Sequence, residues 1–264
     1  MTFSTRTTLG RTGLSVGRIG ISSSFGAPSA AIEEAFAAGC NYLTWGTFVK
    51  GRSPEMKKAL KNIIGRGQRE QLVLSMWSYG HDAFLTEKFF LKGLRDLGID
   101  YADVLLLGYY SKRPRPSIID GALQLKEKGL VRFIGLSSHR RAVYAELLPE
   151  GLFDLFHLRY NAIHRGAETE VFPFLPQKDR PGIVSFTATS WRQLLNAKKT
   201  PAGRPPATAA DCYRFVLSNP NVDVCMMGAR DSQQMRENLK VLESGPMNEE
   251  EMARMRALGD HLHK

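Results

Sequence analysis

The feature that most constrains the fold is a regular alternation of short apolar segments and longer segments with helical signals. Eight apolar segments are typical of strands that are covered on both faces. They lie at residues 19–22, 41–44, 72–76, 103–107, 133–137, 155–158, 183–187 and 224–227. Parallel strands need helical crossovers, and eight such units close into a barrel of about this length. The sequence therefore predicts a (β/α)8 TIM barrel, an α/β fold, with an N-terminal β-hairpin at 8–16 and an extra C-terminal helix.

Helix start and stop signals fall between these strands. Ser29, Thr208 and Asn248 are predicted N-caps, and Pro54 follows the cap Ser53 at a first helical position. The helices are predicted at residues 30–39, 54–64, 85–97, 118–128, 140–148, 171–175 (short and poor), 207–217, from 231 onward, and 248–262.

A doubly wound open sheet is the alternative fold. That fold usually carries Gly-x-Gly-x-x-Gly in its first turn, and the turn after residue 22 has no such motif. No linker, repeat or low-complexity segment marks a boundary, so residues 1–264 are predicted to form one domain.

Composition narrows the class of protein. With 43% hydrophobic and 23% charged residues, the chain resembles a soluble globular protein. No apolar run approaches the ~20 residues of a membrane span, and the first residues lack a signal core. The three cysteines, Cys40, Cys212 and Cys225, are far apart. We therefore expect a cytoplasmic protein with reduced thiols and no membrane partner.

The formal charge of +10 raises the question of nucleic acid. The positive residues are scattered, and the densest patch, residues 112–116, is short and has no aromatic residue. A basic mouth for a phosphorylated small molecule explains the same excess, so no nucleic-acid partner is expected. The histidines and acids show no spacing of a metal site. The oligomeric state is left open.

The last predicted strand leads into a turn with the chemistry of an anion site. Gly228 frees the turn from side-chain clash, and Asp231 or Ser232 can cap the following helix. The first N–H groups of that helix then face a ligand, beside Arg230 and Gln234 as further donors. The alternative is an ordinary strand-to-helix turn.

Four stretches together resemble the aldo/keto reductase family, from the hairpin to the last helix. They are residues 9–16 (LGRTGLSV), 97–107 (LGIDYADVLLL), 129–138 (GLVRFIGLSS) and 228–238, which carries Gly-x-x-x-x-x-Gln-x-x-Glu-Asn. The resemblance implies the barrel predicted above. It also implies that NADP(H) is bound in an extended form across the barrel mouth.

The resemblance assigns cofactor contacts to two regions. The adenine and 2′-phosphate end would contact the last turn, with candidates Gly228, Arg230, Ser232, Gln234, Glu237 and Asn238. The nicotinamide and pyrophosphate end would contact Ser137, Ser138, His157, Phe186, Thr187 and Thr189. In this set Phe186 would stack on nicotinamide, and His157 replaces the usual Gln at the carboxamide. Simple strand-end capping is the alternative for Ser137, Ser138 and Thr187.

The family's catalytic tetrad of Asp, Tyr, Lys and His does not match this chain. The Asp position aligns with Thr44, and the Tyr position with Val49, or with Phe48 if the loop slips by one residue. The Lys position aligns with Trp77 and the His position with Gly108. Without a phenol near a cation, the usual proton relay does not operate.

Other polar aromatic residues are expected near the same mouth. Tyr109 or Tyr110 is a candidate proton donor, and His139 is a candidate for polarising a carbonyl; pocket-wall packing is the alternative for each tyrosine. The expected function is an NADP(H)-dependent oxidoreductase that reduces an unknown carbonyl substrate through a non-standard acid. The alternatives are an inactive NADP(H)-binding sensor or interaction protein, and a barrel that no longer binds cofactor.

Overall fold

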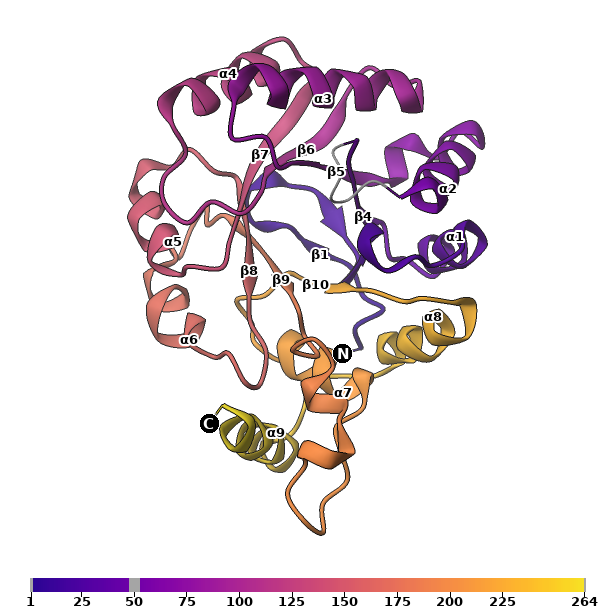
Figure 1. Cartoon of the computed structure of the whole chain (residues 1–264), viewed down its shortest axis with the longest axis vertical. Coiled ribbons are helices and arrows are strands. Elements are labelled where there is room, and N and C mark those ends of the chain that lie inside the picture. Colours follow the sequence, from indigo (N-terminus) through magenta and orange to yellow (C-terminus); the bar gives the residue numbers. More distant parts are fainter. Residues whose placement is uncertain (1, 48–52, 264) are drawn as a thin grey trace.

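The computed structural model describes residues 2–47 and 53–263, and it contains a closed barrel of eight parallel strands (Figure 1). Around the barrel the strand order is β10-β3-β4-β5-β6-β7-β8-β9. The strands are β3 (Ile19–Ser22), β4 (Tyr42–Trp45), β5 (Val73–Ser78), β6 (Ala102–Leu107), β7 (Val131–Ser138), β8 (Leu155–Arg159), β9 (Gly182–Phe186) and β10 (Val224–Met227). The predicted TIM barrel is confirmed, and the closure excludes the open sheet.

Helices surround this barrel on the outside (Figure 1). They are α1 (Ser29–Ala37), α2 (Pro54–Gly65), α3 (Ala83–Leu97), α4 (Pro116–Glu127), α5 (Ala142–Leu147), α6 (Ala167–Glu170), α7 (Ala209–Leu217), α8 (Ser232–Leu239) and α9 (Glu249–Leu262). The extra C-terminal helix is therefore confirmed as α9. The helix predicted at 171–175 was misplaced, since α6 ends at Glu170 and only a 3-10 turn, Phe172–Phe174, follows.

Most of the predicted caps are present as side-chain hydrogen bonds. Ser53 accepts from the third amide of α2, and Thr208 and Asn248 each form a full capping box. Such caps satisfy backbone N–H groups that have no partner inside the helix.

The prediction that Ser29 caps the first helix was wrong. Pro28 occupies the N-cap and Ser29 is the first helical residue. The Ser29 amide instead donates to a carboxylate oxygen of Glu55, 2.8 Å away in α2. A neighbouring helix thus supplies the acceptor that a local side chain usually provides.

The hairpin closes the amino end of the barrel. Strands β1 (Thr7–Thr8) and β2 (Ser15–Val16) pair antiparallel. Leu9 between them belongs to the inner core, and its side chain lies against Gly182, the first residue of β9. A Cβ on Gly182 would lie 2.7 Å from Leu9, so this glycine makes room for the hairpin. Ligands therefore have access to the barrel from the opposite, carboxyl end, where sites of this fold occur.

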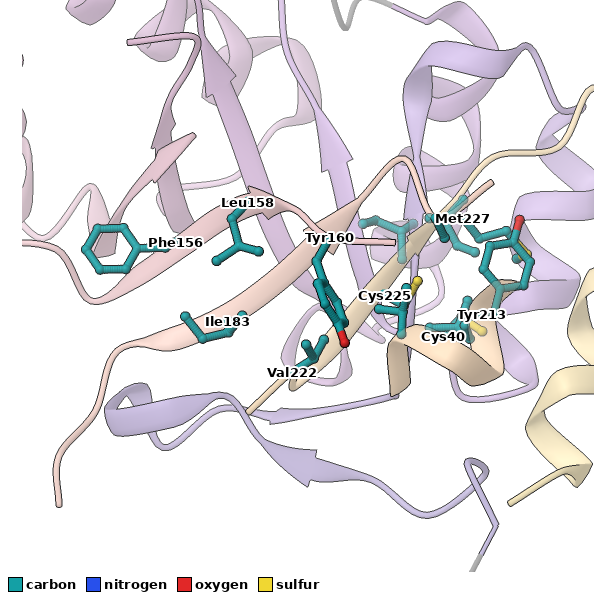
Figure 2. Close-up of a cluster of buried hydrophobic side chains, with 14 of the residues drawn as sticks. Cys40, Phe156, Leu158, Tyr160, Ile183, Tyr213, Val222, Cys225 and Met227 are labelled. Atoms are coloured by element: carbon teal, nitrogen blue, oxygen red, sulfur yellow. The ribbon is translucent and has the colours of Figure 1, made fainter. Parts of the chain in front are cut away.

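A second, larger core lies between the barrel and the helices. Figure 2 shows part of it, with Leu158, Ile183 and Met227 from neighbouring strands and Tyr213 from α7. The cysteines Cys40, Cys212 and Cys225 are unpaired and buried, and burial raises the pKa of each thiol. None of them is thus a nucleophile at neutral pH. Within residues 2–47 and 53–263, no helix has the length and apolarity needed to cross a membrane.

Candidate active site

The inward-facing side chains at the barrel mouth are polar or aromatic. Alternate residues of each strand point to the interior. On β8, Leu155 belongs to the inner core, so His157 and Arg159 face the same way. Trp77 on β5 and Phe186 on β9 also pack against that inner core. These residues come from sequence positions far apart, and the barrel brings them to one end.

The positions expected to hold the family's tetrad carry little acid–base chemistry. Thr44 is buried, with its hydroxyl 3.5 Å from the Ile21 carbonyl oxygen. Trp77 is half-buried. Val49 and Phe48, the expected equivalents of the catalytic tyrosine, lie outside the described residues. Thr44 and Trp77 thus offer a hydroxyl and an indole at the positions that we expect to match the family's carboxylate and ammonium group.

Gly108 has a specific packing reason. A Cβ at this residue would lie 2.9 Å from the ring of Tyr79, closer than real Cβ contacts come. The Gly108 amide also donates to the Ser78 carbonyl at 2.8 Å, which holds the two strand ends together. The Tyr79 ring therefore occupies the space beside Gly108, the position expected to hold the family's histidine.

An unbroken row of aromatic rings crosses the mouth. The rings of Trp77 and Tyr79 stack with centroids 5.2 Å apart, and those of Tyr79 and Tyr109 stack at 5.1 Å. Tyr109 then stacks on His139 at 5.3 Å, and His139 meets Phe186 edge to face at 5.2 Å. The row thus connects the expected tetrad positions with the ring expected to stack on nicotinamide.

Tyr109 has the features of a functional phenol. It has a φ of 58°, in the left-handed region that side chains avoid at a cost of roughly 1–3 kcal/mol. Its side chain is 41% exposed. Burial and a hydrogen bond with Tyr109 raise the pKa of Tyr79, so Tyr79 keeps its proton. Two stacked rings hold Tyr109 in this conformation, and its phenol is accessible.

Tyr110 was predicted as an equal candidate, and its contacts favour the packing alternative. Its side chain is buried, and its hydroxyl donates to the Gly80 carbonyl at 3.1 Å. Its ring stacks on His81 at 4.4 Å, and burial raises its pKa to about 12. Tyr110 is therefore a packing residue.

Two buried polar side chains on the neighbouring strands β7 and β8 lie next to each other. Ser137 on β7 and His157 on β8 are register partners, and both are fully buried. Nε2 of His157 lies 2.7 Å from the Tyr42 hydroxyl. Nδ1 of His157 and Oγ of Ser137 have no hydrogen-bond partner in the part of the chain that the structure describes. Burial lowers the pKa of His157 to about 3, so the ring is neutral. With Tyr42 as donor, the ring proton sits on Nδ1.

These orphaned atoms fit a primary amide, which both donates and accepts. The nicotinamide carboxamide is such a group. Ser138 differs from Ser137, because its hydroxyl bonds the Arg140 backbone at 3.2 and 2.9 Å. For Ser138 the capping alternative therefore describes the observed contacts.

The turn after β9 is locked in an unusual backbone form. Thr187, Ser190, Trp191 and Arg192 all have positive φ, between 48° and 68°. The Asn161 amide donates to the Thr187 carbonyl at 2.8 Å and fixes the start of this turn. Thr189 accepts from the Arg192 amide at 3.3 Å. Several strained residues in one turn are typical of ligand-binding segments.

The turn after β10 has the predicted cap and a close approach. Asp231 caps α8 by accepting from the Gln234 amide at 2.8 Å. A Cβ on Gly228 would lie 2.1 Å from the exposed ring of Phe25, so only glycine lets this ring cover the turn. The Arg230 amide donates to the Gln234 side chain at 2.9 Å, and the Arg230 side chain is exposed.

Two residues expected at the adenine have contacts of their own. Asn238 is buried, and its amide lies 3.5 Å from the Gly228 carbonyl, which ties α8 to the end of β10. Glu237 pairs with Lys240 at 2.8 Å on the surface. Ser232 is the first residue of α8 and is half-buried.

Sequence reasoning missed Arg159 as a site residue. It pairs in register with Phe186, and its guanidinium lies 5.8 Å from the Trp191 ring centre. The signal was present: Arg159 follows His157 by two residues on a buried strand, so it shares the inward face. No group of three or more metal-ligating side chains gathers in residues 2–47 and 53–263.

Comparisons with known proteins agree with the barrel fold. The model of the Aldo/keto reductase family matches residues 22–208. The uncharacterized oxidoreductase YqkF of Bacillus subtilis (strain 168) is 23% identical, covering 87% of this chain and 86% of its own length. The aldo-keto reductase AKR11C1 from Bacillus halodurans, in its holo form, superposes with a TM-score of 0.78 at 21% identity, covering 96% and 95% of the two chains. The thermostable aldo-keto reductase Tm1743 superposes with a TM-score of 0.75 at 21% identity, covering 96% and 99%.

Proposed function

The chain belongs to the aldo/keto reductase family of oxidoreductases, and from that premise we propose that it uses NADP(H) to reduce a carbonyl substrate. In this proposal Tyr109 replaces the family's usual proton donor. The proposal that the chain binds NADP(H) rests on Ser137 Oγ and His157 Nδ1, which lack hydrogen bonds within the described residues. Both residues lie at one register position of neighbouring strands. The holo form of the Bacillus halodurans relative is consistent with a cofactor in this fold.

The residues that would hold the cofactor follow the barrel rim from β7 to β10. Ser137 and His157 would bind the carboxamide, and the face of Phe186 would support the nicotinamide ring. The remaining contacts are proposed for Ser138, Thr187, Thr189, Gly228, Arg230, Ser232, Gln234, Glu237 and Asn238. When bound, the cofactor supplies the hydride for the carbonyl carbon.

The acid half of the reaction rests on Tyr109 and His139. Tyr109 would donate its phenolic proton to the carbonyl oxygen, and the hydrogen bond with Tyr79 would stabilise the phenolate that remains. Burial and the neighbouring Arg159 lower the pKa of His139, so its imidazole is neutral at pH 7. A neutral imidazole N–H can polarise the carbonyl without a competing proton transfer.

The residues at the described tetrad positions favour a second candidate function. Thr44, Trp77 and Gly108 offer no cation or carboxylate to lower the pKa of a phenol. The alternative is a protein that binds NADP(H) without turnover and acts as a sensor or interaction partner. In either case the three buried, unpaired cysteines support a reducing, cytoplasmic location.

NADPH binding separates these functions from a bare scaffold. Titration of NADPH with protein, followed by nicotinamide fluorescence, is expected to show saturable binding. No change at tens of micromolar protein would rule out both functions. If NADPH binds, a screen of aldehydes and quinones for NADPH oxidation at 340 nm then tests turnover.

A further inference from the structure

Within residues 2–47 and 53–263, Arg159 is a cation in the barrel mouth that forms no salt bridge. Its Nε is buried and makes no hydrogen bond. Burial and the neighbouring Arg141 both lower its pKa, and no carboxylate acts in the opposite direction. A half-buried charge that lacks a partner is costly, and proteins normally pair it. The arrangement therefore suits an anion that comes from outside the chain.

The carboxylates on the adjoining segments already have other partners. Glu170 pairs with Arg141 at 2.7 Å, and Glu168 pairs with Arg256 at 2.8 Å. Glu168 also accepts from the Tyr160 hydroxyl at 2.6 Å. None of these acids is left to neutralise Arg159.

The surroundings of Arg159 have the form of a recognition site. The Trp191 ring, 58% exposed, lies 5.8 Å from the guanidinium. Burial and, after it, the neighbouring Arg159 lower the pKa values of His139 and His164, so both rings are neutral at pH 7. His139 also meets Phe186 at 5.2 Å. A planar guanidinium, an aromatic wall and an imidazole donor thus converge beside the proposed nicotinamide position.

We propose that Arg159 binds the carboxylate of the substrate, so that the enzyme prefers carbonyl compounds that carry a carboxylate group. This inference rests on the proposed function, because Phe186 marks the reacting end of the cofactor. A guanidinium matches a carboxylate with two parallel hydrogen bonds. Arg159 pairs in register with Phe186, whereas the proposed pyrophosphate contacts begin one residue later, at Thr187. The position thus favours a substrate anion over a cofactor phosphate.

Two aldehydes of similar shape test the inference. 4-Formylbenzoate carries the carboxylate, and methyl 4-formylbenzoate carries a neutral ester in its place. Binding to the protein, with and without NADP⁺, is measured by tryptophan fluorescence, because Trp191 lies beside Arg159. The variants are Arg159→Met, which keeps most of the stem, and Arg159→Lys, which keeps the charge. Arg204→Met, an exposed arginine that has no part in the proposed site, is the control.

The expected result is selective for the carboxylate. Arg159→Met weakens 4-formylbenzoate binding by about tenfold to a hundredfold, the range for a lost charged hydrogen bond. Binding of the ester and of NADPH changes less than about twofold. Arg159→Lys recovers part of the loss, and Arg204→Met behaves as the wild type. If turnover occurs, KM for the acid rises by the same factor.

Two outcomes would overturn the inference. Equal loss for the acid and the ester would mean that Arg159 only shapes the mouth. A loss of NADPH affinity in Arg159→Met would assign Arg159 to a cofactor phosphate. Absence of NADPH oxidation in every variant would contradict the proposed function alone, since the binding difference between acid and ester is read without turnover.

Discussion

Buried polar side chains lie at the strand ends of β7 and β8, whereas aromatic rings pack together at the strand ends of β5 and β6. On the first pair, Ser137 and His157 face inward with unpartnered atoms. On the second pair, the Trp77 and Tyr79 rings stack at 5.2 Å, and Gly108 makes room for Tyr79. The barrel itself is continuous across both, since β6 and β7 pair in register over much of their length.

The two sides of the barrel mouth therefore differ in what their side chains contribute to stability. A buried polar atom without a partner costs about 1–3 kcal/mol, so a chain that had lost its ligand would gain stability by replacing it. Ser137 Oγ and His157 Nδ1 are such atoms in the described part of the chain. An aromatic row carries no such cost, because its rings stabilise each other by roughly 0.5–1.5 kcal/mol a pair. We therefore expect the side of the mouth at β7 and β8 to bind the cofactor, and the side at β5 and β6 to act through Tyr109.

The largest effect is expected at Tyr109. Tyr109→Phe keeps the ring stacking and removes only the phenol, so kcat should fall about 100-fold or more, as for loss of a general acid. NADPH affinity should stay unchanged, which would sharpen the division between the two sides of the mouth. Steady-state kinetics with the best substrate of the screen provide the measurement. Tyr110→Phe is the control, because that hydroxyl bonds only Gly80. Equal kcat values for wild type and Tyr109→Phe would refute the proposed acid.

The next effect concerns His157 and pH. The pKa of His157 is lowered by burial to about 3, against an ordinary value of 6.5. Between these values the unfolded chain binds a proton that the native chain does not, so stability falls as pH decreases below 6.5. The slope is about 1.4 kcal/mol per pH unit.

His157→Gln removes this slope while it keeps a group that can bond Tyr42. The advantage of the wild type over the variant at pH 7 should therefore shrink by roughly 2–3 kcal/mol at pH 4.5. Urea unfolding at several pH values measures it, and NADPH titration at pH 7 serves as the check on the site. Parallel pH profiles for the two proteins would show that His157 titrates normally in the native state.

A smaller effect, on NADPH affinity, is expected at the turn after β10. Arg230→Met removes an exposed cation next to the capped start of α8, so NADPH should bind about tenfold more weakly. NADH lacks the 2′-phosphate, and its affinity should not change. The control is Arg236→Met, whose guanidinium pairs with Glu34 at 2.8 Å. If NADPH and NADH weaken equally, Arg230 does not read the 2′-phosphate.

The sequence was sufficient for the barrel because its signals are local. Strand cores, the Thr208 and Asn248 caps and the Gly98 helix end each depend on a few neighbouring residues. The site was harder to predict, since its contacts join distant strands. The bond of Tyr110 to Gly80 and the approach of Phe25 to Gly228 leave no mark in the sequence.

The smallest effects are expected at two glycines, one after β6 and one after β10. Gly108→Ala would push a Cβ against the Tyr79 ring, and Gly228→Ala would do the same to the Phe25 ring. Neither glycine has a positive φ, so the added methyl acts through the ring it displaces and not through backbone strain. Each ring is a side chain that can rotate, so we expect stability losses of only about 1 kcal/mol.

The two variants should then differ in what they disturb. Gly108→Ala shifts the ring that bonds Tyr109, so kcat should fall severalfold while NADPH affinity holds. Gly228→Ala disturbs the turn beneath the adenine end, so NADPH affinity should fall severalfold while kcat at saturating NADPH holds. A second change, Phe25→Ala, should relieve Gly228→Ala because it removes the ring in the way. If each glycine variant lowered both kcat and NADPH affinity, the strand ends near Tyr109 and the turn after β10 would be coupled. Separate roles for these two regions would then be refuted.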